Sequence, residues 1–313
     1  MPGGATALER GLAWLNRQGQ QELTTAPRRN FSGLTLSPDG TQAAVVVANA
    51  TGVVGTDIWV WTIARGALTR LTFTGAASSP VWTPDGRRIC YSGTLEAFCQ
   101  AADGSGQPLS LFKLPGSTEL GSISPDGTRL VFTVSAQTSV AARDIMIATF
   151  GPPIEVRPLI KTAFGENSPR VSPDGRWMAY ASLESGRNEV YVRPFPEVDR
   201  GRWQVSTDGG FNPRWAKNGR ELFFAKGGFG TPRSFWSTQV QPGSTFVAGK
   251  PSEIAKSAST AAVSVEYDVA PDGRFLVHVD ASSGAAAAAS RPQLVVVQHW
   301  FDELKARVPV SPR

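Results

Sequence analysis

A chain of 313 residues that is 41% hydrophobic and 18% charged can bury a substantial core, which argues against an intrinsically disordered protein. Its 32 glycines and 23 prolines favour many short strands joined by tight turns over long helices. The formal net charge of +5 comes mostly from singly scattered arginines, with Arg28-Arg29 and Arg87-Arg88 as the densest groups. We therefore expect no nucleic-acid partner.

The N-terminal sequence, MPGGATALERGLAWL, lacks the basic start and long apolar core of a secretory signal. As written, the chain carries no export address and its compartment is left open: cytoplasmic as it stands, periplasmic or extracytoplasmic if the start is truncated. No apolar stretch approaches the ~20 residues that span a bilayer, so we expect no membrane insertion.

A four-residue motif, Ser-Pro-Asp-Gly or a close variant, recurs along the chain. Its proline stands at positions 38, 84, 125, 173 and 271, and a degenerate copy at 216–219 fills the one gap. The spacings of 46, 41, 48, 44 and 54 residues, without a helical pattern between copies, are typical of propeller blades.

Each copy of the motif predicts a tight turn between two antiparallel strands. Proline presets the first central position of a type I turn, aspartate suits the second, and glycine adopts the left-handed conformation that closes the hairpin. One turn role explains every repeated aspartate, so we expect no calcium site. The predicted turn residues are Asp39, Gly40, Asp85, Gly86, Asp126, Gly127, Asp174, Gly175, Asp272 and Gly273.

Two more strands follow each hairpin. The third begins after an acidic residue in its clearest copies, at Asp57, Asp144 and Glu189, and the fourth is clearest at 68–74, 156–160 and 203–206. Four strands in about 45 residues make one blade. We predict an all-β, six-bladed propeller of four-stranded antiparallel blades. The expected repeat units are 31–75, 76–114, 115–161, 162–207, 208–256 and 257–301, the last closed with 12–24.

The two ends of the chain are expected to share the last blade. Residues 263–279 supply only two strands, and 12–17 with 20–24 supply two more, which closes the ring and shields its sheet edges. The segment 294–301 then reads as one strand too many, which leaves a seven-bladed or incomplete ring open. Between them, 281–291 is a low-complexity loop.

Four segments of the sequence resemble TolB-like, WD-type propeller repeats: DIWVWTIARGALTRLTF, PVWTPDGRRICYSG, ENSPRVSPDGRWMAYASLESGRNEVYVRPFP and STDGGFNPRWAKNGRELFF. They are similar in particular to the C-terminal propellers of bacterial serine/threonine kinases, as is LVVVQHWFDELK at 294–305. The resemblance covers roughly residues 12–305 and implies one TolB-like domain over 1–313. No kinase motif accompanies it.

Residues of catalytic type are scarce. His278 and His299 are the only histidines and are expected to fill core or surface positions, and no Gly-x-Ser-x-Gly elbow or zinc-ligand spacing occurs. We therefore expect a non-catalytic binding module without cofactor or metal: the sensor part of a signalling protein or an envelope assembly factor. Two alternatives stay open: a small propeller hydrolase or lyase with a carboxylate or metal site on the channel axis, and a fragment of a larger kinase–propeller protein.

Cys90 and Cys99 are placed roughly opposite one another by a short hairpin around Thr94-Leu95. They form either a cross-strand disulfide or two buried thiols that act as small apolar residues. Direct cross-strand geometry is strained for a disulfide, so we favour free thiols.

Propellers usually bind ligands at the ends of the channel, which the first strand of each blade lines. Polar side chains gather on one side of these predicted strands. A rim with both signs of charge suits a protein or peptide partner of a monomeric module; alternatively, these residues pair with one another. The candidate binding residues are Ser168, Arg170, Asn212, Arg214, Glu266 and Asp268.

Overall fold

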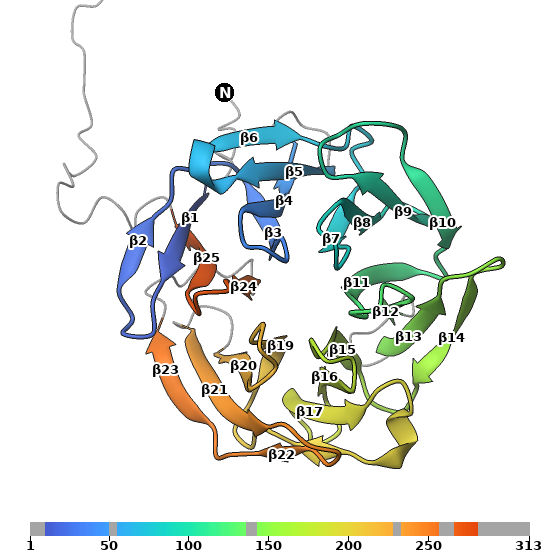
Figure 1. Ribbon diagram of the computed structural model, residues 1–313, viewed down its shortest axis with the longest axis vertical. Helices are drawn as coiled ribbons and strands as arrows, with labels where there is room; N and C mark the ends of the chain where they lie inside the picture. The colour runs from blue at the N-terminus through green and yellow to red at the C-terminus, as the bar shows by residue number, and fades with distance from the viewer. Residues whose placement is uncertain (1–9, 50–54, 136–142, 228–232, 257–265, 281–313) are drawn as a thin grey trace, which may run out of the picture.

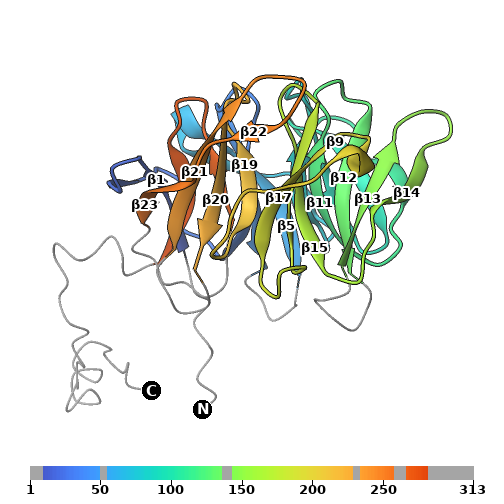
Figure 2. The same ribbon diagram turned by 90° about the horizontal axis from the view of Figure 1, so that it is seen from below.

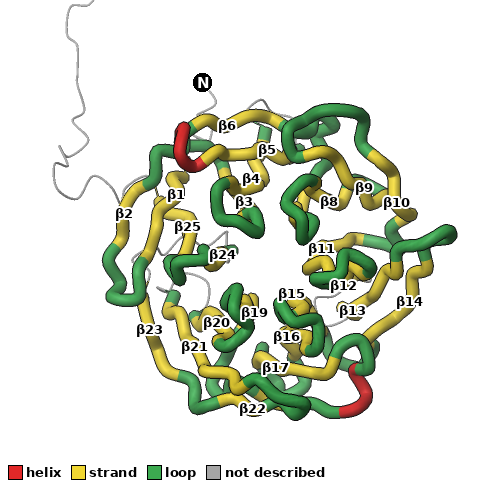
Figure 3. Tube along the Cα trace, in the orientation of Figure 1, coloured by secondary structure: helices red, strands yellow, loops and turns green. Residues whose placement is uncertain are grey.

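The computed structural model describes residues 10–49, 55–135, 143–227, 233–256 and 266–280. They form six antiparallel sheets arranged as the blades of a ring (Figure 1), which confirms the predicted six-bladed propeller. Seen from the side, the strands run between the two faces of the ring (Figure 2). The helical turns among these residues are short, η1 (Ile63–Arg65) and η2 (Val198–Arg200), and both lie on the rim (Figure 3).

The first three blades each use four consecutive strands, which follow one another from the centre of the ring to its rim (Figure 1). The first contains β3 (Phe31–Leu36), β4 (Gln42–Ala48), β5 (Thr56–Thr62) and β6 (Ala67–Arg70). The second contains β7 (Ser78–Trp82), β8 (Arg88–Ser92), β9 (Glu96–Ala101) and β10 (Leu109–Lys113). The third contains β11 (Ser117–Ile123), β12 (Arg129–Ser135), β13 (Arg143–Thr149) and β14 (Glu155–Ile160).

The fourth and fifth blades follow the same order, and the fifth has a divided outer strand. The fourth contains β15 (Glu166–Val171), β16 (Trp177–Ser182), β17 (Glu189–Pro194) and β18 (Trp203–Gln204). The fifth contains β19 (Phe211–Trp215), β20 (Glu221–Lys226), β21 (Ser234–Gln241), β22 (Val247–Ala248) and β23 (Ser252–Lys256). Both β22 and β23 pair with β21, so this blade has two short outer strands where the others have one.

The sixth blade contains strands from both parts of the chain, as the sequence predicted. Its order from the centre is β24 (Tyr267–Val269), β25 (Phe275–Asp280), β1 (Arg10–Leu15) and β2 (Gln21–Leu23). The register places Leu12 opposite His278 and Trp14 opposite Leu276. The N-terminal strand therefore lies between the C-terminal hairpin and the rim (Figure 1). The predicted segments 281–291 and 294–301, with His299, lie outside the described residues.

The repeated motif forms the inner hairpin turn of every blade. Its glycine, or Gly219 in the degenerate copy, has a φ between 68° and 83°, the left-handed region that glycine adopts without steric cost. The aspartate accepts a hydrogen bond from the backbone N–H two residues later, as in Asp39 with Thr41 at 3.0 Å. Asn218 does the same for Arg220 at 3.0 Å, which explains why the degenerate copy still makes the turn.

The acidic residue at the start of a third strand fastens the outer part of its blade. Asp57 is fully buried and accepts hydrogen bonds from Arg70 at 2.6 Å and Thr72 at 2.9 Å, both at the end of the first blade. Glu189 in the fourth blade accepts one from the equivalent Ser206. A buried carboxylate needs such partners, so these acids have a structural role.

Apolar side chains fill the space between neighbouring blades. Leu12, Phe31 and Leu276 belong to the cluster that joins the first and sixth blades. Phe223 of the fifth blade meets Phe275 of the sixth edge-on, with ring centroids 5.4 Å apart. Each blade is buried on both faces by its neighbours, which explains the nearly continuous apolar runs of the second strands. Side chains of the six innermost strands remain to line the centre.

Candidate ligand site at the mouth of the channel

Three innermost strands share an unusual backbone conformation at one level of the channel. Ser79, Ser168 and Asn212 have φ values of 50°, 54° and 50°, and each precedes a proline. They lie within bulges that shift the register of β7, β15 and β19. Side chains other than glycine rarely adopt positive φ, and such conformations concentrate at functional sites.

The same level carries a chain of polar side chains between the fourth and fifth blades. The Ser168 hydroxyl donates to Asn212 Oδ1 at 2.8 Å, and it also lies 3.1 Å from Asn167 Oδ1. Asn167 Nδ2 in turn donates to Asn188 Oδ1 at 3.4 Å. Amide and hydroxyl groups held in this way present both donors and acceptors to a ligand.

Halfway along the channel, charged side chains connect one blade to the next. Arg170 Nη1 donates to the carbonyl oxygen of Gly121, so the fourth blade contacts the third. Arg214 Nε of the fifth blade lies 3.6 Å from Asp268 Oδ1 of the sixth. Asp268 Oδ2 accepts from Leu36 N at 2.8 Å in the first blade. Some predicted channel residues thus pair with one another, and the pairing joins the blades.

Burial changes the acid–base properties of this group. Desolvation, reinforced by the neighbouring Arg214 charge, lowers the pKa of Arg170 to about 9. Burial raises the pKa of the Glu266 carboxyl, although the arginine charges and a hydrogen bond from Leu34 N, 3.1 Å from Oε2, oppose the rise. Charged groups in this environment are poorly screened, so they interact strongly with one another and with any ligand charge.

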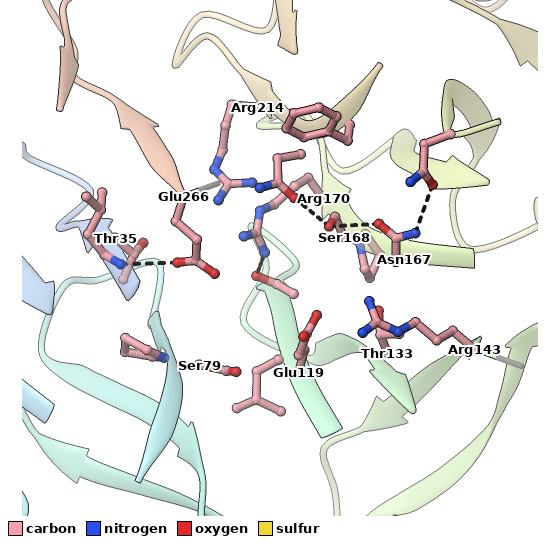
Figure 4. A pocket seen from close by; sticks show the side chains of 18 of the residues that line it. Thr35, Ser79, Glu119, Thr133, Arg143, Asn167, Ser168, Arg170, Arg214 and Glu266 are labelled. Atoms are coloured by element: carbon pink, nitrogen blue, oxygen red, sulfur yellow. Dashed lines mark hydrogen bonds between the residues drawn. The ribbon is translucent and has the colours of Figure 1, made fainter. Parts of the chain in front are cut away.

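These features surround a cavity of about 650 Å³ at the mouth of the channel (Figure 4). Five of the six predicted residues line it, namely Ser168, Arg170, Asn212, Arg214 and Glu266. The sixth, Asp268, lines a smaller cavity of about 300 Å³ at the other end, on the side of the Pro-Asp-Gly turns. Arg170 and Arg214 line both cavities, as do Thr35 and Gly121, so the two cavities adjoin at this part of the channel wall.

The cavity also contains residues that the sequence did not indicate. Glu119 and Thr133 come from the third blade, as does Arg143, whose side chain extends into the pocket in Figure 4. Phe211 and Arg233 come from the fifth blade. The guanidinium carbon of Arg233 lies 5.7 Å from the centroid of the Phe211 ring. Arg143 is the first residue of the third strand β13, and Arg233 directly precedes the third strand β21. Both lie away from the repeated motif, so their place at the start of a third strand is the one sequence signal that could have identified them.

The two cysteines correct a prediction. Cys90 and Cys99 are bonded as a disulfide, whereas free thiols were favoured. They are paired directly across β8 and β9 with Cα atoms 3.9 Å apart, so both side chains leave the same face of the hairpin at close range. The direct pairing across the two strands, which favoured free thiols in the sequence, is the pairing that brings the two sulfur atoms together. Both residues line a hollow of about 750 Å³ between the second and third blades.

His278 lies in the core of the sixth blade. Its ring stacks on Phe31 with centroids 6.1 Å apart, and burial together with the nearby Arg10 charge lowers its pKa to about 3. It is therefore neutral at physiological pH, whereas a catalytic histidine usually gains and loses a proton near that pH. Among the described residues, no group of three or more His, Cys, Asp or Glu side chains could hold a metal ion. Nor does this part of the chain contain a helix long and apolar enough to cross a membrane.

The fold is similar to several solved propellers. A putative TolB from Agrobacterium tumefaciens superposes with a TM-score of 0.65 at 15% identity, over 88% of this chain and 99% of that one. TolB from Acinetobacter baumannii gives 0.57 at 18% identity, over 80% and 68%. The chain has a TolB-like propeller fold. At these identities the likeness shows the fold alone.

An enzyme is also among the structures that are similar to this chain. An oligogalacturonate lyase from Vibrio parahaemolyticus superposes with a TM-score of 0.55 at 11% identity, over 84% of this chain and 76% of that one. No protein-family model matches the sequence, and no curated protein matches it. The chemistry of this chain therefore has to be argued from its own residues.

Proposed function

We propose that this chain is a non-catalytic binding module that receives a peptide or protein tail in the cavity at the channel mouth. The observation that carries the proposal is the cavity itself, whose volume of about 650 Å³ falls in the range of ligand pockets. Its wall combines apolar groups such as Leu34 and Leu120 with the amides of Asn167, Asn188 and Asn212.

The conformation of the innermost strands supports the same proposal. Bulges with positive φ at Ser79, Ser168 and Asn212 set this level of the channel in a fixed geometry before any ligand arrives. A preformed pocket does not spend binding free energy on ordering its own groups. The similarity of the repeats to kinase-linked propellers supports a sensor role, in which the bound tail belongs to a partner protein.

The proposal can be tested by selecting displayed random peptides on the purified chain. Two variants locate the binding. Glu119→Trp places a bulky ring at the cavity from an exposed position on β11, and Lys217→Trp does so at the opposite end of the channel, also from an exposed position. Peptides selected on the native chain should lose at least about tenfold in affinity for Glu119→Trp and keep it for Lys217→Trp.

Three outcomes would contradict the proposal. No peptide enriches over an unrelated six-bladed propeller, or the selected peptides bind Glu119→Trp as well as the native chain. The third is turnover: cleavage of a bound peptide or of an acidic polysaccharide by the purified chain would show an enzyme, as in the lyase that shares the fold.

A further inference from the structure

The charges at the channel mouth do not balance. Four arginines line the cavity, Arg143, Arg170, Arg214 and Arg233, against two carboxylates, Glu119 and Glu266. Arg214 has Asp268 beside it. Glu266 and Asp268 lie close enough to Arg170 for their charges to oppose the lowering of its pKa. Arg143 and Arg233, by contrast, form no ion pair with a carboxylate of the described residues. A cavity with this excess of cations attracts an anion.

Two of these arginines also have buried donor atoms without a partner. Arg143 Nε and Arg233 Nη1 are inaccessible to solvent and make no hydrogen bond within the described structure. Those two nitrogens are enclosed by the protein, but both residues are half-buried and line the cavity, so an anion there meets the rest of their guanidinium groups. The two residues come from the third and fifth blades, so a ligand that contacts both has to enter the cavity between them.

The floor of the cavity carries the third cation. Arg170 donates to Gly121 O through Nη1, and its side chain lines the cavity. Arg170 and Arg214 also line the cavity at the opposite end, so both arginines lie where the two cavities adjoin. A polypeptide tail that enters the mouth end-first brings its terminal carboxylate toward this cation.

The neutral side of the cavity matches a peptide. The linked groups of Asn167, Ser168, Asn188 and Asn212 offer alternating donors and acceptors at the height of the mouth. Peptide groups have the same alternation, so an extended tail can exchange hydrogen bonds with this wall while its charged end points to the arginines.

We propose that the mouth recognises the C-terminal carboxylate of a peptide tail, with Arg143, Arg170 and Arg233 as the recognising groups. The inference rests on the proposed function and specifies the chemistry of its ligand. Arginine binds carboxylates through paired N–H donors, and its planar fork gives such a contact both strength and direction.

The test compares two probes on the native chain by NMR, with the side-chain Nε–Hε signals of the three arginines as the readout. The first probe is N-acetyl-tetraalanine with a free C-terminus, and the second is the same peptide with a C-terminal amide. The free acid should bind at least about tenfold more tightly and shift the arginine signals. The comparison needs no variant, so it does not depend on whether a substituted chain folds.

A matched pair of variants then assigns the contact. Arg143→Gln with Arg233→Gln should abolish the preference for the free acid, whereas Arg143→Lys with Arg233→Lys should retain part of it. The control removes the same charge elsewhere, by Arg200→Gln with Arg220→Gln, both exposed and outside the cavity. This control should change the affinity for the free acid by less than about twofold.

The results separate this inference from the proposed function. Equal binding of acid and amide overturns the carboxylate assignment, and selected peptides that remain sensitive to Glu119→Trp would then leave binding at the mouth standing. Inorganic phosphate that binds more tightly than the free acid and shifts the same three signals also overturns it, because the mouth is then a phosphate site. Absence of any shift with the free acid at millimolar concentration overturns it as well.

Discussion

Arg17 and Glu221 form a bidentate salt bridge. Nη1 lies 3.1 Å from Oε1 and Nη2 lies 2.7 Å from Oε2, although 204 positions separate the two residues. Arg17 follows β1 in the sixth blade, and Glu221 begins β20 in the fifth. The contact therefore fastens the N-terminal hairpin to a blade formed more than two hundred residues later, beside the place where the ring closes.

Loss of this contact should weaken the closed ring. The Glu221 side chain is 10% exposed and the pair is bidentate, so Glu221→Gln should lower the free energy of unfolding by about 1–2 kcal/mol. Glu253→Gln is the control, since its pair with Lys256 is local and exposed and should be worth less than about 0.5 kcal/mol. Urea unfolding measures both, and equal losses would show that the Arg17 contact contributes nothing special.

The buried side chains of β1 should contribute more to the free energy of unfolding than the exposed side chains of its neighbour β2. Leu12→Ala removes a side chain that is 1% exposed between the first and sixth blades, and should cost about 2–4 kcal/mol. Leu23→Ala on β2 removes one that is 46% exposed, and should cost less than about 0.5 kcal/mol. The difference should appear in the thermal midpoint. A harmless Leu12→Ala would mean that the ring is stable without β1.

Two glycines at equivalent turns should differ in their tolerance of alanine. Gly127 and Gly40 have the same left-handed φ, 72° and 73°, so alanine costs about 1–2 kcal/mol at either for conformation alone. A Cβ on Gly127 would meet nothing within 4 Å, whereas one on Gly40 would lie 2.6 Å from Pro271 Cδ. Gly40→Ala should therefore lower the free energy of unfolding more than Gly127→Ala. Equal losses of stability in the two variants would mean that the turn at Pro271 moves away from the added methyl group at no cost in free energy.

The buried carboxyl of Glu166 should make stability depend on pH. Burial raises its pKa to about 7, with Asp144 and Glu184 adding to the rise and a hydrogen bond from Thr162 and the Arg193 charge opposing it. A carboxyl whose pKa is higher in the folded state holds its proton better there, so the stability it contributes is lost as the pH rises from about 4.5 to about 7.

Replacement of this carboxyl should flatten the profile. Between pH 5 and pH 8 the Glu166→Gln variant should lose about 1–3 kcal/mol less free energy of unfolding than the native chain. Glu22→Gln, at an exposed position on β2, should leave the profile unchanged. Urea unfolding at several pH values provides the measurement, and parallel profiles for all three proteins would contradict the role of Glu166.

The disulfide predicts a specific pattern of labelling. Chain purified without reductant and unfolded in guanidinium should take up no iodoacetamide, and after reduction it should take up two groups, as mass spectrometry will show. Reduction should also lower the free energy of unfolding by about 2–3 kcal/mol, the value expected for a closed loop of this length. The Cys90→Ala/Cys99→Ala variant should show no effect of reductant. Two groups taken up before reduction would show free thiols.

The architecture could be predicted from the sequence because its signals are local. The turn chemistry at Asp39-Gly40 and its copies depends on residues two or three positions apart, and these bonds are present in every described turn. Repetition at a fixed period then gave the blades, and the incomplete last repeat required the N-terminal strands to complete it. Within the described strands, the divided outer strand of the fifth blade, β22 with β23, departs from that pattern.

The sequence by itself predicted the propeller, a ring closed by both ends of the chain, and the polar channel residues that include Ser168, Arg170 and Asn212. The tertiary structure alone decided that Arg143 and Arg233 share a cavity with them, and that Cys90 and Cys99 approach closely enough to bond. The reason is physical. A turn forms from neighbours in the chain, but the surroundings of a side chain depend on which blades the closed ring brings together and on how much water it excludes between them.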